Sequence, residues 1–257
     1  MKEVHMIVQG KGGVGKSLIS TILAQYLKEQ LPEENIHCFD TDPVNRTFHR
    51  YQALQTEMVD IMDEHNNINS IMFDGLVEKM IELDGVGVVD NGAATFVPFM
   101  SYIAENHVPE LLNESGVRLI LHVPMNGGQA LPDCLEGLVH ILENIDADIV
   151  VWLNDHNGKV ERDGKTFTDF KVYKNNANRF IGIVHIENRN PDTYGADIER
   201  MTSLNLTFAE VQESPEFTLM PRQRIRTLKR DLFAKLEGLP IAANQSAKAV
   251  KEGKPDA

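Results

Sequence analysis

The stretch that decides the fold is Gly10-Lys11-Gly12-Gly13-Val14-Gly15-Lys16-Ser17. It follows an apolar run from Val4 to Val8, which predicts a buried strand, and it precedes residues 18–31, whose apolar side chains recur at helical spacing. A loop with the pattern G-x-x-x-x-G-K-[ST] between a strand and a helix is typical of a P-loop. Its glycines let backbone N–H groups approach phosphate oxygens, and the helix adds the positive end of its dipole.

The P-loop pattern also predicts which residues hold a nucleotide. Lys16 supplies a positive charge for the β- and γ-phosphates, and Ser17 offers its hydroxyl to Mg²⁺. We therefore expect ATP and Mg²⁺ as cofactors. The expected nucleotide contacts in the loop and at the start of the helix are Gly10, Lys11, Gly12, Gly13, Val14, Gly15, Lys16, Ser17 and Leu18.

Two other interpretations of the same glycines are less favoured. The letters from Gly10 to Gly15 also fit the dinucleotide pattern G-x-G-x-x-G, and Asp40 lies near the distance at which that pattern requires an acid. A dinucleotide loop, however, has no use for the Lys16-Ser17 pair in this register. A glycine-rich turn with lysines there by chance is less favoured still, because the whole eight-residue pattern matches in the right context.

Lys11 adds information that a plain P-loop does not carry. The sequence KGGVGKS resembles the deviant Walker A box of the ParA/MinD family, which also includes nitrogenase iron protein and the arsenite-pump ATPases. In that family the early lysine reaches across a dimer interface to the partner's nucleotide. The resemblance therefore implies that Lys11 acts in catalysis together with Lys16, and that the chain forms a homodimer when ATP binds. The alternative is a solvated loop lysine.

Two further acidic boxes follow apolar runs. Residues 35–42 predict a strand that ends in Asp40-Thr41-Asp42-Pro43, and by the same resemblance Asp40 would orient or deprotonate the attacking water. Asp42 would act through Mg²⁺ or through a loop that contacts the partner, although either aspartate could instead cap the next helix. The run from Val86 to Asp90 predicts a buried parallel strand that carries a Walker B aspartate, and Asp90 would bind Mg²⁺ through water. Asn91-Gly92 departs from the second acid or proline usual in partition proteins.

The rest of the chain alternates between predicted strands and helices from residue 4 to about residue 235. This alternation predicts an α/β fold with a doubly wound, mostly parallel sheet and helices on both faces. We expect one P-loop domain over residues 1–240 and a disordered tail over residues 241–257. The hydrophilic residues 157–178, with a hairpin turn at Asp163-Gly164, predict an excursion from the sheet and a partner surface. Residues 202–211 are expected to hold the last β element.

Three other features concern ligands and partners. Residues 148–153 predict a further buried strand, which ends at Asn154-Asp155. In family members an asparagine after this strand reads adenine, which implies an adenine contact for Asn154, whereas an Asn-Asp turn is the alternative. The basic cluster from Arg222 to Arg230 carries an apolar stripe. Proteins of the ParA type hold DNA with a basic patch near this region, and the alternative is a surface helix that packs on the sheet. The tail lacks bulky apolar residues, so no membrane anchor is expected.

Composition limits the possible partners and compartments. The 257 residues carry a formal net charge of −13, which disfavours non-specific binding to nucleic acid or anionic membranes over the surface as a whole. No apolar run is long enough to span a bilayer, and the N-terminus enters the first strand at once, so we expect a cytoplasmic protein. The two cysteines, Cys38 and Cys134, form no C-x-x-C pair. A cluster like that of nitrogenase iron protein is therefore not expected.

The segments HMIVQGKGGVGKS and FDTDPVNRTF also resemble a narrower group, the TraL/StbB-like proteins of conjugative plasmids. We therefore expect a Mg²⁺-ATP-dependent, dimerising ATPase switch that acts in plasmid transfer or in plasmid partition and stability, with DNA or a DNA-binding plasmid protein as partner. Two alternatives remain open. One is a small-molecule kinase or synthetase of the dethiobiotin synthetase type, and the other is a nucleotide-gated scaffold with little hydrolysis.

Overall fold

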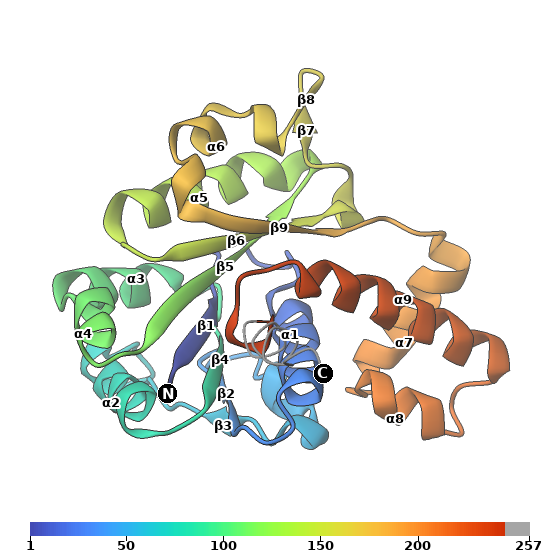
Figure 1. Cartoon of the computed structure of the whole chain (residues 1–257), viewed down its shortest axis with the longest axis horizontal. Helices are drawn as coiled ribbons and strands as arrows, with labels where there is room; N and C mark the ends of the chain where they lie inside the picture. Colours follow the sequence, from blue (N-terminus) through green and yellow to red (C-terminus); the bar gives the residue numbers. More distant parts are fainter. Residues whose placement is uncertain (245–257) are drawn as a thin grey trace, which may run out of the picture.

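A computed structural model describes residues 1–244, and its centre is a parallel sheet. Within these residues the seven strands lie in the order β3-β2-β4-β1-β5-β6-β9, and every neighbouring pair is parallel (Figure 1). The strands are β1 (Glu3–Ile7), β2 (Ile36–Asp40), β3 (Glu57–Met58), β4 (Val86–Asp90), β5 (Arg118–Asn126), β6 (Asp148–Asn154) and β9 (Phe180–Ile186). The chain winds outward from β1 in both directions, so the predicted doubly wound α/β fold is confirmed.

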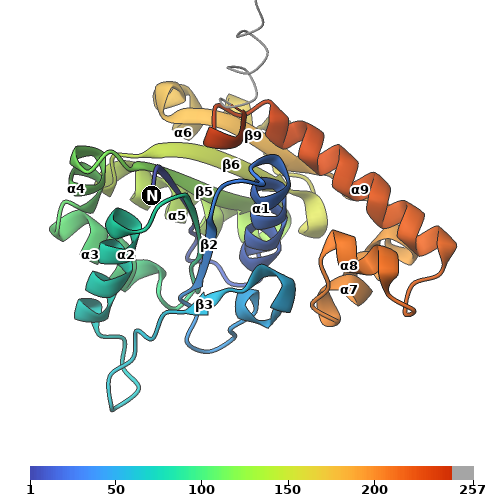
Figure 2. The same cartoon turned by 60° about the horizontal axis from the view of Figure 1, so that its bottom comes forward.

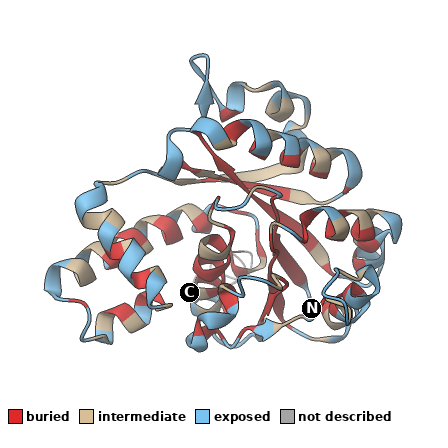
Figure 3. Cartoon of the chain, turned by 180° about the vertical axis from the view of Figure 1, so that it is seen from behind, coloured by how far each residue is buried: buried red, intermediate tan, exposed pale blue. Residues whose placement is uncertain are grey.

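Helices cover both faces of the sheet, and their apolar sides form two cores. One face carries α1 (Lys16–Gln30) and α9 (Leu219–Glu237), and the other carries α2 (Asp74–Glu82), α3 (Phe96–Glu105), α4 (Val108–Glu114) and α5 (Leu131–Asn144). The central strands β1, β4, β5 and β6 are buried almost throughout, whereas the edge strands β3 and β9 are largely half-buried and the outer sides of the helices are exposed (Figure 3). Together with α7 (Ala196–Ser203) and α8 (Phe208–Glu213), the N-terminal half of α9 extends away from the sheet (Figure 2).

Several expected elements differ from those in the structure. The predicted last β element at residues 202–211 is wrong, because these residues form the end of α7, a loop and most of α8. Thr207 and Glu210 form a capping box that starts α8, and Asn205 takes a left-handed conformation with φ 52° in the preceding loop. The strand β5 runs to Asn126. After β2, residues 45–54 hold two short 3₁₀ turns, Phe48–Arg50 and Gln52–Leu54.

The segment 157–178 crosses the outer edge of the sheet beside β9. It holds a small hairpin of β7 (Glu161–Arg162) and β8 (Lys165–Thr166), whose turn is the predicted Asp163-Gly164 with φ 52° and 71°. Phe167, which follows β8, is buried and contacts Phe170, Tyr173 and Phe180 edge to face. The short helix α6 (Lys171–Asn175) completes the segment. The hairpin itself is exposed.

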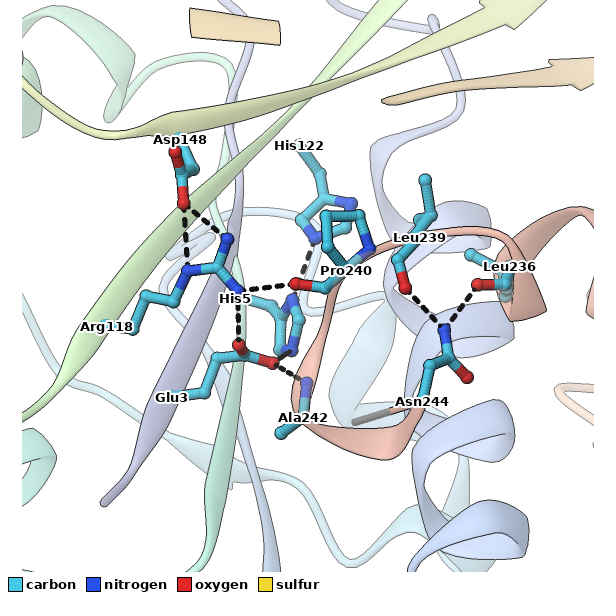
Figure 4. Close-up of polar contacts among 10 residues, drawn as sticks. All are labelled: Glu3, His5, Arg118, His122, Asp148, Leu236, Leu239, Pro240, Ala242 and Asn244. Atoms are coloured by element: carbon cyan, nitrogen blue, oxygen red, sulfur yellow. Dashed lines mark hydrogen bonds and ion pairs between the residues drawn. The ribbon is translucent and has the colours of Figure 1, made fainter. Parts of the chain in front are cut away.

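The last described residues pack against the amino ends of the central strands, at the opposite end of the sheet from the P-loop (Figure 4). Arg118 donates to the carbonyl of Pro240 and to Asp148, and Glu3 accepts a hydrogen bond of 2.8 Å from the backbone N–H of Ala242. The side-chain amide of Asn244 donates to two carbonyls at the end of α9 and just beyond it. Residues 241–244 are thus part of the packed structure, and the rest of the expected tail, 245–257, lies outside the described residues.

Glu3 begins a buried row of polar and aromatic side chains, which continues through His5 and His122 to Trp152. The indole of Trp152 donates to His122 Nδ1 at 2.9 Å, so neutral His122 carries its proton on Nε2, which lies 2.9 Å from His5 Nδ1. His5 Nε2 in turn lies 3.0 Å from Glu3 Oε1. Burial lowers the pKa of His122 well below its usual value. Burial alone would raise the pKa of Glu3, but His5, the Ala242 N–H and Arg118 together lower it.

The burial of His122 predicts that the fold loses stability in acid. Because the pKa of His122 is lower in the folded than in the unfolded protein, the unfolded state binds more protons, and stability is lost as the pH falls below about 6.5. We expect the free energy of unfolding to fall by roughly 1 kcal/mol per pH unit there. His122→Gln keeps an acceptor for Trp152 and should flatten this dependence. Urea unfolding at several pH values compares the two proteins, and equal slopes would show that His122 does not carry the effect.

Candidate functional site

The P-loop lies at the carboxyl end of β1, between β4 and β5. Gly13 and Gly15 have φ angles of 73° and 96°, which favour glycine, and α1 begins at the next residue, Lys16. A Cβ on Gly10 would lie only 2.9 Å from the Phe96 ring. The expected strand, loop and helix are therefore present, and Leu18 packs into the core from the first turn of α1. The predicted contacts of these residues with a nucleotide stay predictions.

Lys16 is folded back over its own loop. Its Nζ donates to the carbonyl of Lys11 at 3.2 Å, and the residue is only 9% exposed. Burial lowers the pKa of Lys16, whereas the nearby carboxylates of Asp90 and Asp42 raise it. A lysine in this position has one weak partner and two acidic neighbours. It is thus placed to exchange the carbonyl for a phosphate oxygen.

Asp90 forms a second buried centre beside the first turn of α1. The hydroxyl of Ser20 donates to Asp90 Oδ1 at 2.8 Å, and it also bonds the carbonyl of Lys16. Burial raises the pKa of Asp90 to about 7, although hydrogen bonds from Ser17 and Ser20 oppose the increase. Sequence reasoning missed Ser20, which lies one helical turn after Ser17 and therefore on the same face of α1.

The donor set around Asp90 fits a magnesium ion. A buried carboxylate and the Ser17 hydroxyl are oxygen ligands of the kind that Mg²⁺ takes, and a cation would offset the cost of burying the Asp90 charge. Among residues 1–244, no group of three or more histidine, cysteine or acidic side chains is arranged to hold a metal ion.

The two aspartates of the second box have different surroundings. Asp40 is fully buried, and its two oxygens accept hydrogen bonds from the backbone N–H groups of Asp42 and His49 at 2.9 and 3.0 Å. Burial raises the pKa of Asp40, and these backbone bonds oppose the increase. Asp42 is partly exposed, and its Oδ1 accepts from the N–H groups of Val44 and Asn45. Asp40 therefore shapes the loop, and Asp42 both caps the following turn and lies near Lys16.

Lys11 points toward α5, whereas Lys16 points back over the loop. Its Nζ lies 2.7 Å from Asp133 Oδ2, and both side chains are well exposed. The hydrogen bond to Asp133 raises the pKa of Lys11. A groove of about 530 Å³ adjoins this pair and includes Phe96, Val97 and Val139 in its lining. Sequence reasoning did not find Asp133, because more than a hundred residues separate it from Lys11.

Asn154 lies against the P-loop at the end of β6. Its Nδ2 donates to the carbonyl of Val14 at 3.1 Å, and its Oδ1 accepts from the N–H of His156 at 3.2 Å. The second bond is the turn expected as the alternative to an adenine contact, and the first ties β6 to the loop. The neighbouring Asp155 accepts a hydrogen bond from His185 on β9. The adenine contact of Asn154 stays a prediction.

The basic cluster lies on α9, and its apolar stripe is buried against the sheet and α8. Arg222 donates to the carbonyl of Ser214, and Arg226 donates to the side chain of Gln212. The other three cations form ion pairs, which are Arg224–Asp197, Lys229–Glu29 and Arg230–Asp231. The apolar side of α9 thus packs against the protein, as the second interpretation of the basic cluster expects. Three of its five positive charges are paired with carboxylates.

Residues 5–226 match the model of the CobQ/CobB/MinD/ParA nucleotide binding domain family. The chain belongs to this family. The predicted resemblance to ParA/MinD proteins is therefore confirmed, and this family member carries a nucleotide-binding domain. No helix within residues 1–244 is long and apolar enough to cross a membrane.

Two relatives of this family member come from Escherichia coli, and each is called protein TraL. Both are 41% identical to it over 245 residues, which cover 94% of this chain and 100% of each relative. Among solved structures, MinD from Aquifex aeolicus has a TM-score of 0.47 at 15% identity and covers 90% of this chain and 97% of its own. A protein of Borrelia burgdorferi described as a plasmid partition protein, bound to AMPPNP, also scores 0.47, at 14% identity, covering 92% and 100%.

Proposed function

We propose that this family member is a Mg²⁺-ATP-dependent ATPase switch that closes as a homodimer and serves plasmid transfer or partition. The observation that carries the proposal is the different placement of two lysines in one loop. Lys16 is buried among acidic side chains at the phosphate site, whereas Lys11 is held outward at the rim by Asp133. A lysine that served only its own nucleotide would gain nothing from this outward position. The relation to the TraL proteins supports the plasmid role.

The buried side of the loop would handle the nucleotide. Lys16 would bind the β- and γ-phosphates, and Ser17 with Asp90 would hold Mg²⁺. When bound, the metal would neutralise charge on the phosphoryl oxygens. Both Asp40 oxygens hold backbone N–H groups of the loop, whereas Asp42 Oδ2 is held only by the exposed side-chain amide of Asn45 at 3.1 Å, which can move aside. We therefore assign the orientation of the attacking water to Asp42, in preference to Asp40, to which the family resemblance assigns it. Asp40 would then act by fixing the position of Asp42.

The exposed side of the loop would bind a second copy of the chain. Lys11 would leave Asp133 and reach the phosphates of the partner's nucleotide, which offers more negative charge than one carboxylate. Both members of the pair are exposed, so solvent screens the contact and release costs little. The dimer would therefore form only when the facing subunit holds a nucleoside triphosphate. After hydrolysis the two subunits would separate.

The geometry of α9 favours a DNA-binding protein over DNA itself as the partner. Three of the five cations from Arg222 to Arg230 pair with carboxylates, and the net charge of the chain is −13. A protein that holds DNA without sequence preference needs several free cations to neutralise phosphates. The exposed hairpin within residues 157–178 is the first surface to test for a protein partner.

We expect no salt-sensitive DNA binding tighter than about 10 µM, even with a non-hydrolysable ATP analogue, since free cations are few. Fluorescence anisotropy at about 50 and 200 mM salt measures this directly. The matched variant replaces Arg226 and Arg230 with alanine, because these side chains hold no buried partner. Tight, salt-sensitive binding by the wild type that is lost in this variant would instead show that α9 binds DNA.

A further inference from the structure

A buried amide, Asn91, joins the two loops that flank the phosphate site. Its Oδ1 accepts a hydrogen bond of 2.9 Å from the hydroxyl of Thr41, which stands between the two aspartates of the second box. The same oxygen accepts from the hydroxyl of Thr95, the residue before α3. Asn91 is 1% exposed, and both threonines are fully buried. One amide thus holds both hydroxyls.

The two loops also meet through their backbones. The N–H of Thr41 donates to the carbonyl of Asp90 at 3.0 Å. Each hydroxyl has one proton and a backbone carbonyl as its second acceptor within reach, Asp90 at 3.2 Å for Thr41 and Gly92 at 2.8 Å for Thr95. A Cβ on Gly92 would lie 2.9 Å from Asp42 Cγ, so only glycine lets the loops approach this closely. A displacement of Asp42 toward Gly92 would therefore press on the turn that leads into α3.

The amide is not fully satisfied by these contacts. Among residues 1–244, Asn91 Nδ2 is buried and has no hydrogen-bond partner. If the amide were turned over, the two hydroxyls would face its nitrogen and the oxygen would be left alone, so either orientation leaves one buried polar atom unpaired. An unpaired buried atom costs stability. An apolar residue of similar shape would avoid the cost of the unpaired nitrogen, but it would lose the acceptor that both hydroxyls use.

We infer that Asn91 is a positioning residue that couples the Asp40–Asp42 loop to the start of α3. The state of the nucleotide would act on Asp42, and Asn91 would transmit the change through Thr41 and Thr95 to α3, beside the groove next to Lys11. The unpaired atom would gain a partner when nucleotide and its water fill the site. This inference rests on the proposed ATPase function and adds the residue that links hydrolysis to the dimer face.

The test is a double-mutant cycle with Thr41→Val and Thr95→Val, which remove the two hydroxyls and keep the side-chain shape. Each variant should bind ATP within about threefold of the wild type and turn it over roughly tenfold more slowly. The double variant should be no slower than either single variant, because both act through Asn91. Thr56→Val is the control, since the Thr56 hydroxyl is also buried but bonds nothing within residues 1–244.

Hydrogen exchange of residues 96–105 provides a readout that a merely structural role would not change. In the wild type, the ATP analogue should alter exchange across α3, and in Asn91→Ala this response should disappear while ATP still binds. Multiplicative effects in the cycle, or an unchanged α3 response in Asn91→Ala, would overturn the inference and leave the proposed function intact. Failure of the wild type to bind ATP would overturn both.

Discussion

Replacing Lys16 with alanine is expected to abolish measurable MgATP binding. The side chain is buried beside Asp90 and Asp42, whereas Lys11, the other cation of the loop, is paired with Asp133. The variant loses charge-assisted hydrogen bonds worth about 1.5–3 kcal/mol each, which weakens binding by roughly 100-fold or more if two are lost. Calorimetric titration of the pure variant with MgATP makes the measurement.

Lys11→Ala is the matched control for this experiment. It removes a lysine from the same loop, but one whose side chain contacts Asp133 outside the phosphate site. We expect this variant to bind MgATP as a monomer with nearly the affinity of the wild type. If Lys16→Ala bound ATP as well as Lys11→Ala does, the loop would not be a phosphate site.

The second large effect is expected from Asp42→Asn, which should bind ATP normally but hydrolyse it about 100-fold or more slowly. A carboxylate that orients or deprotonates the attacking water contributes on this scale. The amide keeps the acceptor that caps the turn at Val44 and Asn45, so the loop should stay in place. Single-turnover hydrolysis separates this chemical step from binding.

Asp40→Asn distinguishes the two aspartates. Asp40 holds the N–H groups of Asp42 and His49, so the amide should mainly lower the thermal unfolding temperature and reduce turnover less than Asp42→Asn does. If hydrolysis were lost only in Asp40→Asn and the stability of that variant were unchanged, Asp40 would be the residue that orients the attacking water, as the sequence alone suggests.

The central strands and the P-loop could be predicted because their signals are local. The continuous apolar run from Val86 to Asp90 requires burial on both faces, and the glycines of the loop require conformations that other residues avoid. The same local logic, applied more completely, would have found α8, since Thr207 and Glu210 form a capping box. The apolar stretch there was misinterpreted as a strand because short apolar runs fit both structures.

The contacts that give the site its character depend on residues far apart in the sequence. Neither the Lys11–Asp133 pair nor the Thr41–Asn91 bond follows from spacing, because each depends on how α5 and the carboxyl ends of β1, β2 and β4 are placed relative to one another. One of the two hydrogen bonds to Asp40 comes from the backbone N–H of His49, whose position a sequence pattern does not predict. The sequence could therefore predict which residues form the loop, but not that Lys16 is buried while Lys11 pairs with Asp133.

The most direct test of the central claim is sedimentation of the wild type with Mg²⁺ and a non-hydrolysable ATP analogue, compared with ADP. The account predicts a dimer with the analogue, a monomer with ADP, and a monomer with either nucleotide in Lys11→Ala. Asp133→Asn, which frees Lys11, should dimerise at a lower analogue concentration than the wild type. A wild type that binds the analogue and stays monomeric, or a Lys11→Ala variant that dimerises as readily as the wild type, would contradict the account.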